Sequence, residues 1–296
     1  MRVVTNQGSN LHPTMVAEYD VALAPQDIDV YGIRYDTRLG IELDQVDRWV
    51  KTARQHPIVL GSSTSQLVRL LIEVAKTDRE ILFITSSRKI IGTYDAVLNA
   101  IETLREDRRH ADLDIRVVDT GMADVGAALP VLLAAEAIRA GESLDLVEAR
   151  INNFCRSGRM SIYIENLEGL VEGGRASFLR SWMANILRVR PILGFQDGEL
   201  QAKLKVSTSE DELGALAECL AAELPSRRVW AAVSDGNDPH RRKGLLAALD
   251  SAFELEYVYA LPISPGIYLH SAAGSVCAAV FPAPMDVCAP VQLPSG

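Results

Sequence analysis

The sequence lacks the residue patterns that mark metal centres, nucleotide sites and redox pairs. It has only four cysteines, and none of them forms a C-x-x-C pair. The metalloprotease signature H-E-x-x-H, the Walker A loop and the G-x-G-x-x-G loop are absent as well. We therefore expect neither a metal nor a cofactor. The scattered cysteines are typical of free thiols in a reducing compartment: Cys155, Cys219, Cys277 and Cys288.

Long apolar runs are missing too. No stretch is long enough to span a bilayer, and residues 1–5 have the pattern of a β-strand rather than of a signal peptide. The net charge is −9, which argues against nucleic acid as a partner. These features predict a cytoplasmic protein that binds no nucleic acid.

Lysine is absent from one stretch that is rich in arginine. From Arg150 to Arg190 the chain has seven arginines, three acidic residues and no lysine. Arginine presents a planar fork that suits carboxylate or phosphate groups. The stretch is either a solvated face with local ion pairs or a surface that docks an anionic partner. Under the second interpretation, the docking residues are Arg175, Arg180 and Arg190.

What the sequence does contain is a sizeable core. Of its 296 residues, 48% are hydrophobic and 23% are charged, which is typical of a globular protein. This length is comfortable for two domains, and Gly141-Glu142-Ser143 marks a break between them. We predict one α/β domain over residues 1–142 and a second α/β domain over residues 143–296.

Apolar periodicity predicts the elements of both domains. In the first, strands are expected over 2–5, 19–23, 28–34, 58–60, 80–84 and 114–118, and helices over 43–55, 66–77, 92–105 and 123–140. This alternation implies a mostly parallel sheet with helices on both faces. In the second, strands are expected over 189–194, 200–206, 255–261, 267–270 and 276–281. Helices are expected over 144–154, from the capping box 209–212 through Leu220, and from the cap Asp238-Pro239 through Phe253. The turn Asp197-Gly198 predicts a hairpin and hence a mixed sheet.

Hydroxyl side chains gather where the strand 80–84 is expected to end. Thr85, Ser86 and Ser87 follow it directly, just before the helix that begins near Gly92. Ligands of open α/β sheets bind at the carboxyl ends of strands, and helix N-termini there favour an anion. No Walker glycines and no general base stand beside these residues. The segment is therefore suited to holding an anionic group rather than to cleaving one.

Two other expected strand ends carry small polar residues, in the segments 62–66 and 119–121. Ser, Thr and Asp also cap helix N-termini, so each segment alone is better explained as a cap. Three such segments, together with Thr93 and His270, favour a ligand-binding crevice. Against a carboxylate, His270 would be a charge-assisted donor whose titration near neutrality makes binding sensitive to pH.

The same residue types allow one catalytic alternative. Ser86 or Ser87, with His270 and Asp119, supplies the side chains of a hydrolase triad. The G-x-S-x-G elbow that exposes such a nucleophile is missing. A serine-dependent acyl hydrolase or transferase is the enzymatic alternative to a binding protein.

In their order and spacing, several segments resemble motifs of the DegV family of bacterial fatty-acid-binding proteins, and the resemblance runs over nearly the whole chain. Thr64-Ser65-Gln66 is similar to T-S-Q-P, and Ser86-Ser87 with Gly92-Thr93-Tyr94 is similar to S-S-x-L-S-G-T-Y. The remaining matches are Val118-Asp119-Thr120 with Gly126 to the V-D-S segment, Gly173-Gly174-Arg175 to G-G-R-I, Arg190-Pro191-Ile192-Leu193 to K-P-I-L, and His270 to the histidine of H-x-G-P-G.

The resemblance implies two α/β domains that hold a long-chain fatty acid between or within them. It implies a carrier rather than an enzyme, which presents the acid to a separate ATP-dependent fatty-acid kinase for acyl-phosphate formation. Transient contact with a membrane surface is compatible with that role. The residues expected to bind the carboxylate are Thr64, Ser65, Ser86, Ser87, Thr93 and His270.

The chain departs from the family's motifs at several positions. Asn6 replaces the aspartate of T-D-S, and Ile91 replaces the serine of L-S-G-T-Y. Ala272-Ala273 stands in place of the Gly-Pro pair of H-x-G-P-G. A hydrogen bond to a charged group typically contributes about 1.5–3 kcal/mol, so losing the hydroxyl at Ile91 could weaken the site. A second alternative is therefore a divergent member that has lost or altered lipid binding.

Overall fold

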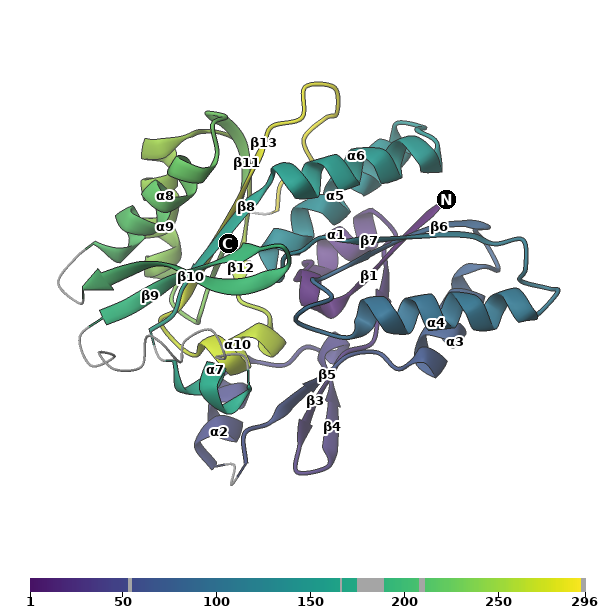
Figure 1. Cartoon of the computed structure of the whole chain (residues 1–296), viewed down its shortest axis with the longest axis horizontal. Helices are drawn as coiled ribbons and strands as arrows, with labels where there is room; N and C mark the ends of the chain where they lie inside the picture. Colours follow the sequence, from purple (N-terminus) through teal and green to yellow (C-terminus); the bar gives the residue numbers. More distant parts are fainter. Residues whose placement is uncertain (53–54, 166, 175–188, 208–210, 294–296) are drawn as a thin grey trace.

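The computed structural model describes residues 1–52, 55–165, 167–174, 189–207 and 211–293 (Figure 1). Its first sheet has four parallel strands in the order β2-β1-β6-β7. These strands are β2 (Ala22–Ala24), β1 (Arg2–Asn6), β6 (Glu80–Thr85) and β7 (Asp114–Asp119). The parallel sheet predicted for the first half of the chain is confirmed, although the expected strand 19–23 begins only at Ala22.

Helices cover both faces of the parallel sheet, because successive strand residues point to opposite faces. One face of the sheet, with Val4 and Phe83, packs against α3 (Thr64–Val74) and α4 (Thr93–Glu106). The other, with Val3 and Ile84, packs against α5 (Val125–Arg139) and α6 (Leu144–Ser157). The short helices η1 (Gln7–Ser9) and α1 (Pro13–Glu18) follow β1. Within the described residues, no helix is long and apolar enough to cross a membrane.

The second sheet has six strands in the order β10-β9-β8-β13-β11-β12, and only the pair β11–β12 is parallel. The predicted mixed sheet is therefore confirmed. Its strands are β8 (Arg159–Tyr163), β9 (Val189–Gln196), β10 (Glu199–Ser207), β11 (Arg228–Asp235), β12 (Glu254–Pro262) and β13 (Val276–Pro282). Helices α8 (Glu212–Glu223) and α9 (Pro239–Ala252) pack on one face of it.

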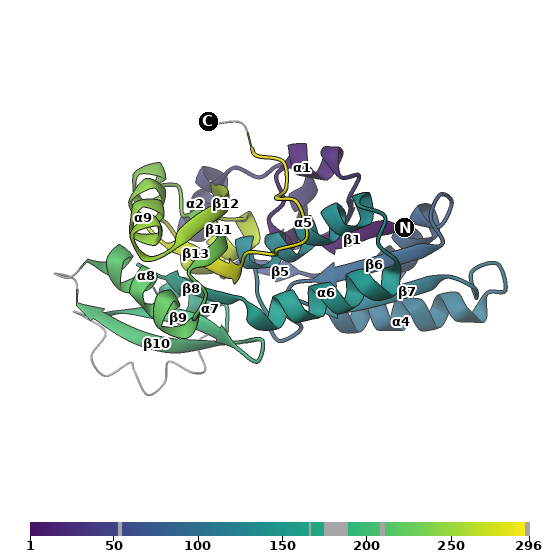
Figure 2. The same cartoon turned by 90° about the horizontal axis from the view of Figure 1, so that it is seen from above.

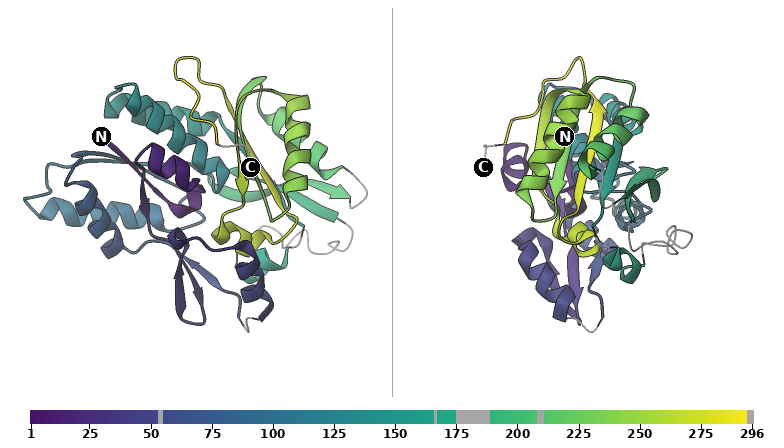
Figure 3. Two further views of the ribbon diagram at one scale, coloured as in Figure 1. Left: turned by 180° about the vertical axis from the view of Figure 1, so that it is seen from behind. Right: turned by 90° about the vertical axis from the view of Figure 1, so that its left-hand side faces the viewer.

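A small third sheet, in the order β4-β3-β5, corrects two predictions. Residues 28–34 are not one strand, because Tyr31 and Gly32 have positive φ and turn the chain between β3 (Asp27–Val30) and β4 (Ile33–Asp36). The strand β5 (Ile58–Leu60) pairs antiparallel with β3 and not with the parallel sheet. The segment 62–66 therefore does not follow a strand of the parallel sheet. The short helix η2 (Thr37–Leu39) and the helix α2 (Leu43–Thr52) follow β4 in the chain, and Figure 3 shows this sheet projecting beside α2.

The expected strand 267–270 is wrong, since these residues belong to helix α10 (Pro265–Ser271). Ser264 has the extended backbone of a helix N-cap, and Pro265 occupies the first turn, where its missing N–H costs nothing. Four apolar or aromatic residues in a row fit a buried strand and a buried helix equally well. The neighbouring helix α7 (Glu168–Glu172) packs against α10 (Figure 1).

The largest core cluster joins the two halves of the chain. It contains Val3 and Leu82 of the parallel sheet together with Trp230 and Phe281 of the mixed sheet. Figure 2 shows helix α5 between these two sheets. Thirteen of the fifteen residues of α5 are buried, including Pro130, which explains why its pattern is apolar on all sides. The division of the chain at residue 142 stays a prediction.

One buried carboxylate crosses between the halves at the start of α5. Asp124 is fully buried, and its Oδ1 accepts a hydrogen bond from the backbone N–H of Ser264 at 2.9 Å. Its Oδ2 accepts one from the hydroxyl of Ser234, at the end of β11. Its own backbone N–H donates to the carbonyl of Gly8 at 2.7 Å. These bonds hold Asp124 at φ 52°, ψ −137°, a conformation that side chains rarely adopt.

We predict that Asp124→Ala lowers the free energy of unfolding by about 2–4 kcal/mol, because two buried donors lose their acceptor. Asp124→Gly should cost roughly 1–2 kcal/mol less, since glycine tolerates the positive φ. Urea denaturation measures both. The control Asp250→Ala, on an exposed position of α9, should stay within about 0.5 kcal/mol of the unmodified protein. Equal stability of Asp124→Ala and the control would contradict this role of Asp124.

Candidate functional site

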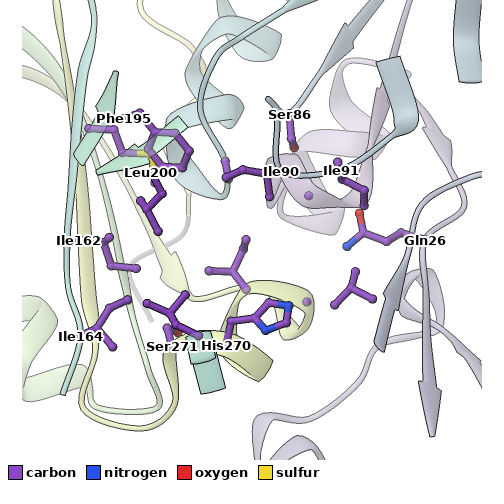
Figure 4. Close-up of a pocket in the computed structure, with 17 residues that line it drawn as sticks. Gln26, Ser86, Ile90, Ile91, Ile162, Ile164, Phe195, Leu200, His270 and Ser271 are labelled. Atoms are coloured by element: carbon purple, nitrogen blue, oxygen red, sulfur yellow. The ribbon is translucent and has the colours of Figure 1, made fainter. Parts of the chain in front are cut away.

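The candidate site is a narrow, mostly apolar cavity between the three sheets (Figure 4). Its volume is about 80 Å³, and seventeen residues line it. These residues are Gly8, Gln26, Val59, Ser86, Ile90, Ile91, Ala123, Met160, Ile162, Ile164, Leu170, Phe195, Leu200, Gly266, Ile267, His270 and Ser271.

Four polar side chains line the otherwise mostly apolar cavity, those of Gln26, Ser86, His270 and Ser271. Figure 4 shows Ser86 and Gln26 on one side, whereas Phe195, Leu200 and Ile162 lie on the opposite side. The ring of His270 points into the space between them (Figure 4). A cavity of this kind suits an amphipathic ligand with one polar end and a slender apolar tail.

Ser86 reaches the cavity because it directly follows the buried strand β6. Its backbone N–H donates to Asn6 Oδ1 at 2.9 Å, and Asn6 Nδ2 donates to its hydroxyl oxygen at 3.2 Å. Asn6 ends the adjacent strand β1 and is fully buried. Of the two serines that the sequence could not separate, Ser86 is the one that lines the cavity.

His270 reaches the cavity from the last turn of α10. Its Nδ1 lies 3.3 Å from the carbonyl oxygen of Gly169, and because a carbonyl only accepts, Nδ1 carries the proton. The ring also lies 5.6 Å, centre to centre, from the ring of His56, whose Nδ1 is 3.2 Å from a carboxylate oxygen of Glu172. With Nδ1 so oriented, protonation at Nε2 would make the imidazole a charged donor.

The ring of His270 packs against Gly173, and Ala272 follows its helix with a positive φ. A Cβ atom added at Gly173 would lie 2.4 Å from Nδ1 of His270, so the ring packs directly against bare backbone. After the helix, Ala272 has φ 62°, a value that favours glycine. Alanine therefore stands here in a backbone conformation that the glycine of the family's H-x-G-P-G motif would adopt with less strain.

The other expected carboxylate ligands are not among the residues that line the cavity. Thr64 is half-buried and Ser65 is exposed in the first turn of α3. Ser87 donates a hydrogen bond to the carbonyl of Gly198 at 2.6 Å. Thr93 is buried, and in the described part of the chain nothing bonds its hydroxyl oxygen. The roles expected for these four residues stay predictions.

The segment 62–66 contains a helix cap. Ser63 accepts from the backbone N–H of Gln66, whose side chain accepts from the N–H of Ser63, forming a complete capping box. Thr93 and Ile91 both lie close to Gly61, just before this cap. A Cβ atom added at Gly61 would be 3.0 Å from the hydroxyl oxygen of Thr93 and 3.0 Å from the side chain of Ile91. Ile91 itself adds an apolar group to the cavity wall.

The expected docking arginines cannot all be placed. Arg175 and Arg180 lie outside the described residues, while Arg190, on β9, is half-buried with its Nε 3.8 Å from a carboxylate oxygen of Glu165. Two further arginines of the stretch make local contacts. Arg150 pairs with Glu142 and Asp286, and Arg159 donates to backbone carbonyls including that of Gly158.

The triad arrangement has little support in the described part of the chain. The hydroxyl of Ser87 bonds to a carbonyl, and that of Ser86 to an amide, rather than to an imidazole. Asp119 accepts from the backbone N–H of Gly121 at 2.9 Å, and burial raises the pKa of its carboxyl group. It lines a separate polar cleft. Among the described residues, no three His, Cys, Asp or Glu side chains gather as metal ligands.

Gln26 is a polar residue of the cavity wall for which the sequence predicted no binding role. It is buried between β2 and β3. Its backbone carbonyl oxygen accepts hydrogen bonds from both the N–H and the hydroxyl of Thr37. No motif surrounds it, and only the fold brings it next to Asn6 and Ser86. A glutamine directly before a strand gives no sequence signal of a binding role.

Comparison with known proteins shows where this fold belongs. A DegV domain-containing protein of Streptococcus pyogenes is 26% identical over 275 residues, covering 90% of this chain and 93% of that protein. A solved structure described as the fatty-acid binding of a DegV family protein from Thermus thermophilus has a TM-score of 0.87 at 20% identity, covering 95% of this chain and 99% of that one.

A stearic-acid-binding protein from Eubacterium ventriosum has a TM-score of 0.84 at 18% identity, covering 95% of this chain and 98% of that one. These likenesses confirm the α/β fold. Residues 1–283 match the family described as "Uncharacterised protein, DegV family". Since this match covers nearly the whole chain, the protein belongs to the DegV family.

Proposed function

We propose that the protein binds a long-chain fatty acid in the cavity and acts as its carrier. The observation that carries the proposal is the lining of the cavity, which is mostly apolar and has Ser86, Gln26, His270 and Ser271 as its polar side chains. The carboxylate lies among these polar groups, and the acyl chain extends along Ile162, Phe195 and Leu200. The solved relatives from T. thermophilus and E. ventriosum are described as binding fatty acid and stearic acid, which supports this ligand class.

The energetics of such a complex divide between the two ends of the ligand. Each buried methylene contributes about 0.8 kcal/mol, so the acyl chain supplies most of the affinity. The polar residues fix the direction of the chain, because a carboxylate buried without hydrogen bonds would be strongly disfavoured. Thr64, Ser65 and Thr93 remain proposed contributors to head-group binding, and of the pair Ser86 and Ser87 we propose Ser86 as the direct contact.

The carrier presents its acid to an ATP-dependent fatty-acid kinase, which forms the acyl phosphate. The excess of arginine between residues 150 and 190 supports a docking surface for this partner, with Arg175, Arg180 and Arg190 as the proposed contacts. The carrier has no catalytic role of its own, in keeping with the hydrogen bonds of Ser86 and Ser87. We place this function in the cytoplasm.

Extraction with organic solvent followed by mass spectrometry tests the proposed function. About one equivalent of a co-purified fatty acid supports the carrier. Protein that carries no acid and binds none when titrated would favour a divergent member that has lost lipid binding. Turnover of an acyl ester would instead favour the hydrolase.

We predict that His270→Ala weakens fatty-acid binding by about 1–3 kcal/mol, because a charge-assisted donor is lost. Imidazolium is the form that attracts a carboxylate, so wild-type affinity should fall as the pH is raised and the ring loses its charge. The variant should lose this pH dependence. Titration between pH 6 and 8 measures both effects, with the exposed His240→Ala as control. Parallel pH profiles for wild type and His270→Ala would rule this role out.

The adjacent serines provide a matched pair of substitutions. Ser86→Ala should reduce affinity for the acid by several-fold, because this hydroxyl faces the cavity. Ser87→Ala should lower the free energy of unfolding by about 1 kcal/mol through loss of its bond to Gly198, with affinity per folded molecule retained. Thermal denaturation and titration separate the two effects. Affinity lost in Ser87→Ala and retained in Ser86→Ala would contradict the proposed position of the carboxylate beside Ser86.

For the kinase, we predict that Arg190→Gln leaves affinity for the acid within about twofold but slows acyl-phosphate formation. Charge complementarity mainly sets the rate of association, so the difference should shrink as salt is raised. The measurement is the initial rate with the cognate kinase and ATP at low and high ionic strength. Lys243→Gln, exposed on α9, is the control. A rate equal to wild type at low salt would exclude Arg190 from docking.

A further inference from the structure

Three buried polar side chains meet at one end of the cavity. Asn6, Gln26 and Ser86 are 0%, 5% and 2% exposed, and they come from three segments that are distant in the sequence. Gly8 lies against all three: a Cβ added there would be 2.7 Å from both Asn6 Nδ2 and Ser86 Oγ, and 3.4 Å from Gln26 Oε1. We call these four residues the cradle.

The hydrogen bonds of the cradle determine which way the Asn6 amide faces. The backbone N–H of Ser86 can only donate, so the Asn6 atom 2.9 Å from it is the oxygen. The Asn6 nitrogen must then face the other way, where it donates to Ser86 Oγ at 3.2 Å and to Gln26 Oε1 at 3.5 Å. Asn6 is thus a donor to both of its neighbours.

This direction decides what the neighbours offer to a ligand. The Ser86 oxygen is already an acceptor, so its hydroxyl proton is available to donate into the cavity. The Gln26 oxygen is likewise occupied, and the structure assigns its amide nitrogen no hydrogen-bond acceptor among the described residues. Figure 4 shows that nitrogen turned toward the cavity. The missing side chain of Gly8 keeps the space beside these groups open.

We propose that Gln26 is a head-group-binding residue and that Asn6 is the positioning residue which makes both Gln26 and Ser86 donors, so that the cradle selects an ionised carboxylate. The inference deepens the proposed function and rests on it, since the carboxylate belongs to the fatty acid in the cavity. Uncharged donors suit this task, because they stabilise an anion without leaving a buried charge when the cavity is empty.

Beside Gln26, an aspartate at position 6, the residue that the family's T-D-S motif has there, would reverse the arrangement. It could still accept from the backbone N–H of Ser86, but it could not donate to Ser86 Oγ or to Gln26 Oε1. The Ser86 hydroxyl would then turn its proton toward the aspartate, and Gln26 would be free to rotate its oxygen into the cavity. The cradle would carry a negative charge and would face the ligand with acceptors.

The test compares two ligands with the same tail, hexadecanoic acid and hexadecan-1-ol, by titration calorimetry at pH 8. Gln26→Leu should weaken binding of the acid by about 10–100-fold, the effect of losing a hydrogen bond to a charged group. It should leave the alcohol within about threefold. Gln26→Glu, which keeps the shape and adds charge, should weaken the acid further than Gln26→Leu. Gln201→Leu and Gln201→Glu, on β10, are the matched controls.

Asn6→Asp tests the positioning role with one atom changed. It should lower affinity for the acid by at least tenfold while the alcohol binds as before, whereas Asn99→Asp, exposed on α4, should change neither. A merely structural role would weaken acid and alcohol alike, and thermal denaturation of each variant identifies such a loss.

The outcomes separate this inference from the proposed function. Wild-type protein that binds neither ligand would overturn both. The cradle would be overturned if the wild-type protein binds the acid and the Gln26 and Asn6 variants keep its preference for acid over alcohol. The proposed carrier function would be unaffected by that result. A preference lost in Gln26→Leu, Gln26→Glu and Asn6→Asp, and retained in the controls, supports the cradle.

Discussion

The buried carboxylate of Asp124 sets the spacing between the two halves of the molecule. It bonds to Ser234 and Ser264 in the second half, and its backbone N–H bonds to Gly8 in the first. The cavity takes its walls from both halves, so a shift at Asp124 would change its width. The positive φ of Asp124 persists because these bonds over-determine it. Gly8 also lies against Asn6 and Ser86, so the same residue connects the packing of the halves to the polar end of the cavity.

The polar end of the cavity is built mainly from uncharged groups, which follows from the cost of burial. An unpaired lysine or arginine there would be strongly disfavoured in the empty protein, whereas amide and hydroxyl groups lose much less. His270 also faces the cavity, with its Nδ1 directed at the carbonyl oxygen of Gly169. Such a site can hold an anion when filled and remain stable when empty, which a carrier needs in order to load and release its ligand.

Sequence periodicity predicted α4, because the helical period is clear over its fourteen residues. It also predicted the shorter strand β6, because a continuous apolar run there ends in polar residues. It failed for α10, where the short run Ile267-Tyr268-Leu269 fits either period, and for β5, whose pairing partner no local pattern reveals. The hydroxyl cluster after β6 was found because it is contiguous in the chain. Asn6 and Gln26 were not assigned to the site, because their relation to Ser86 spans up to eighty residues and exists only in the folded chain.

The two serines after β6 show how one contiguous motif can divide its tasks. The chain bends directly after β6, and the two serine hydroxyls have different surroundings. Ser86 lines the cavity, whereas Ser87 bonds to Gly198 at the tip of the β9–β10 hairpin. That hairpin carries Phe195 and Leu200, which form the apolar wall opposite Ser86. Ser87 therefore contributes to the cavity at a distance, by holding the far wall against the strand end from which Ser86 projects.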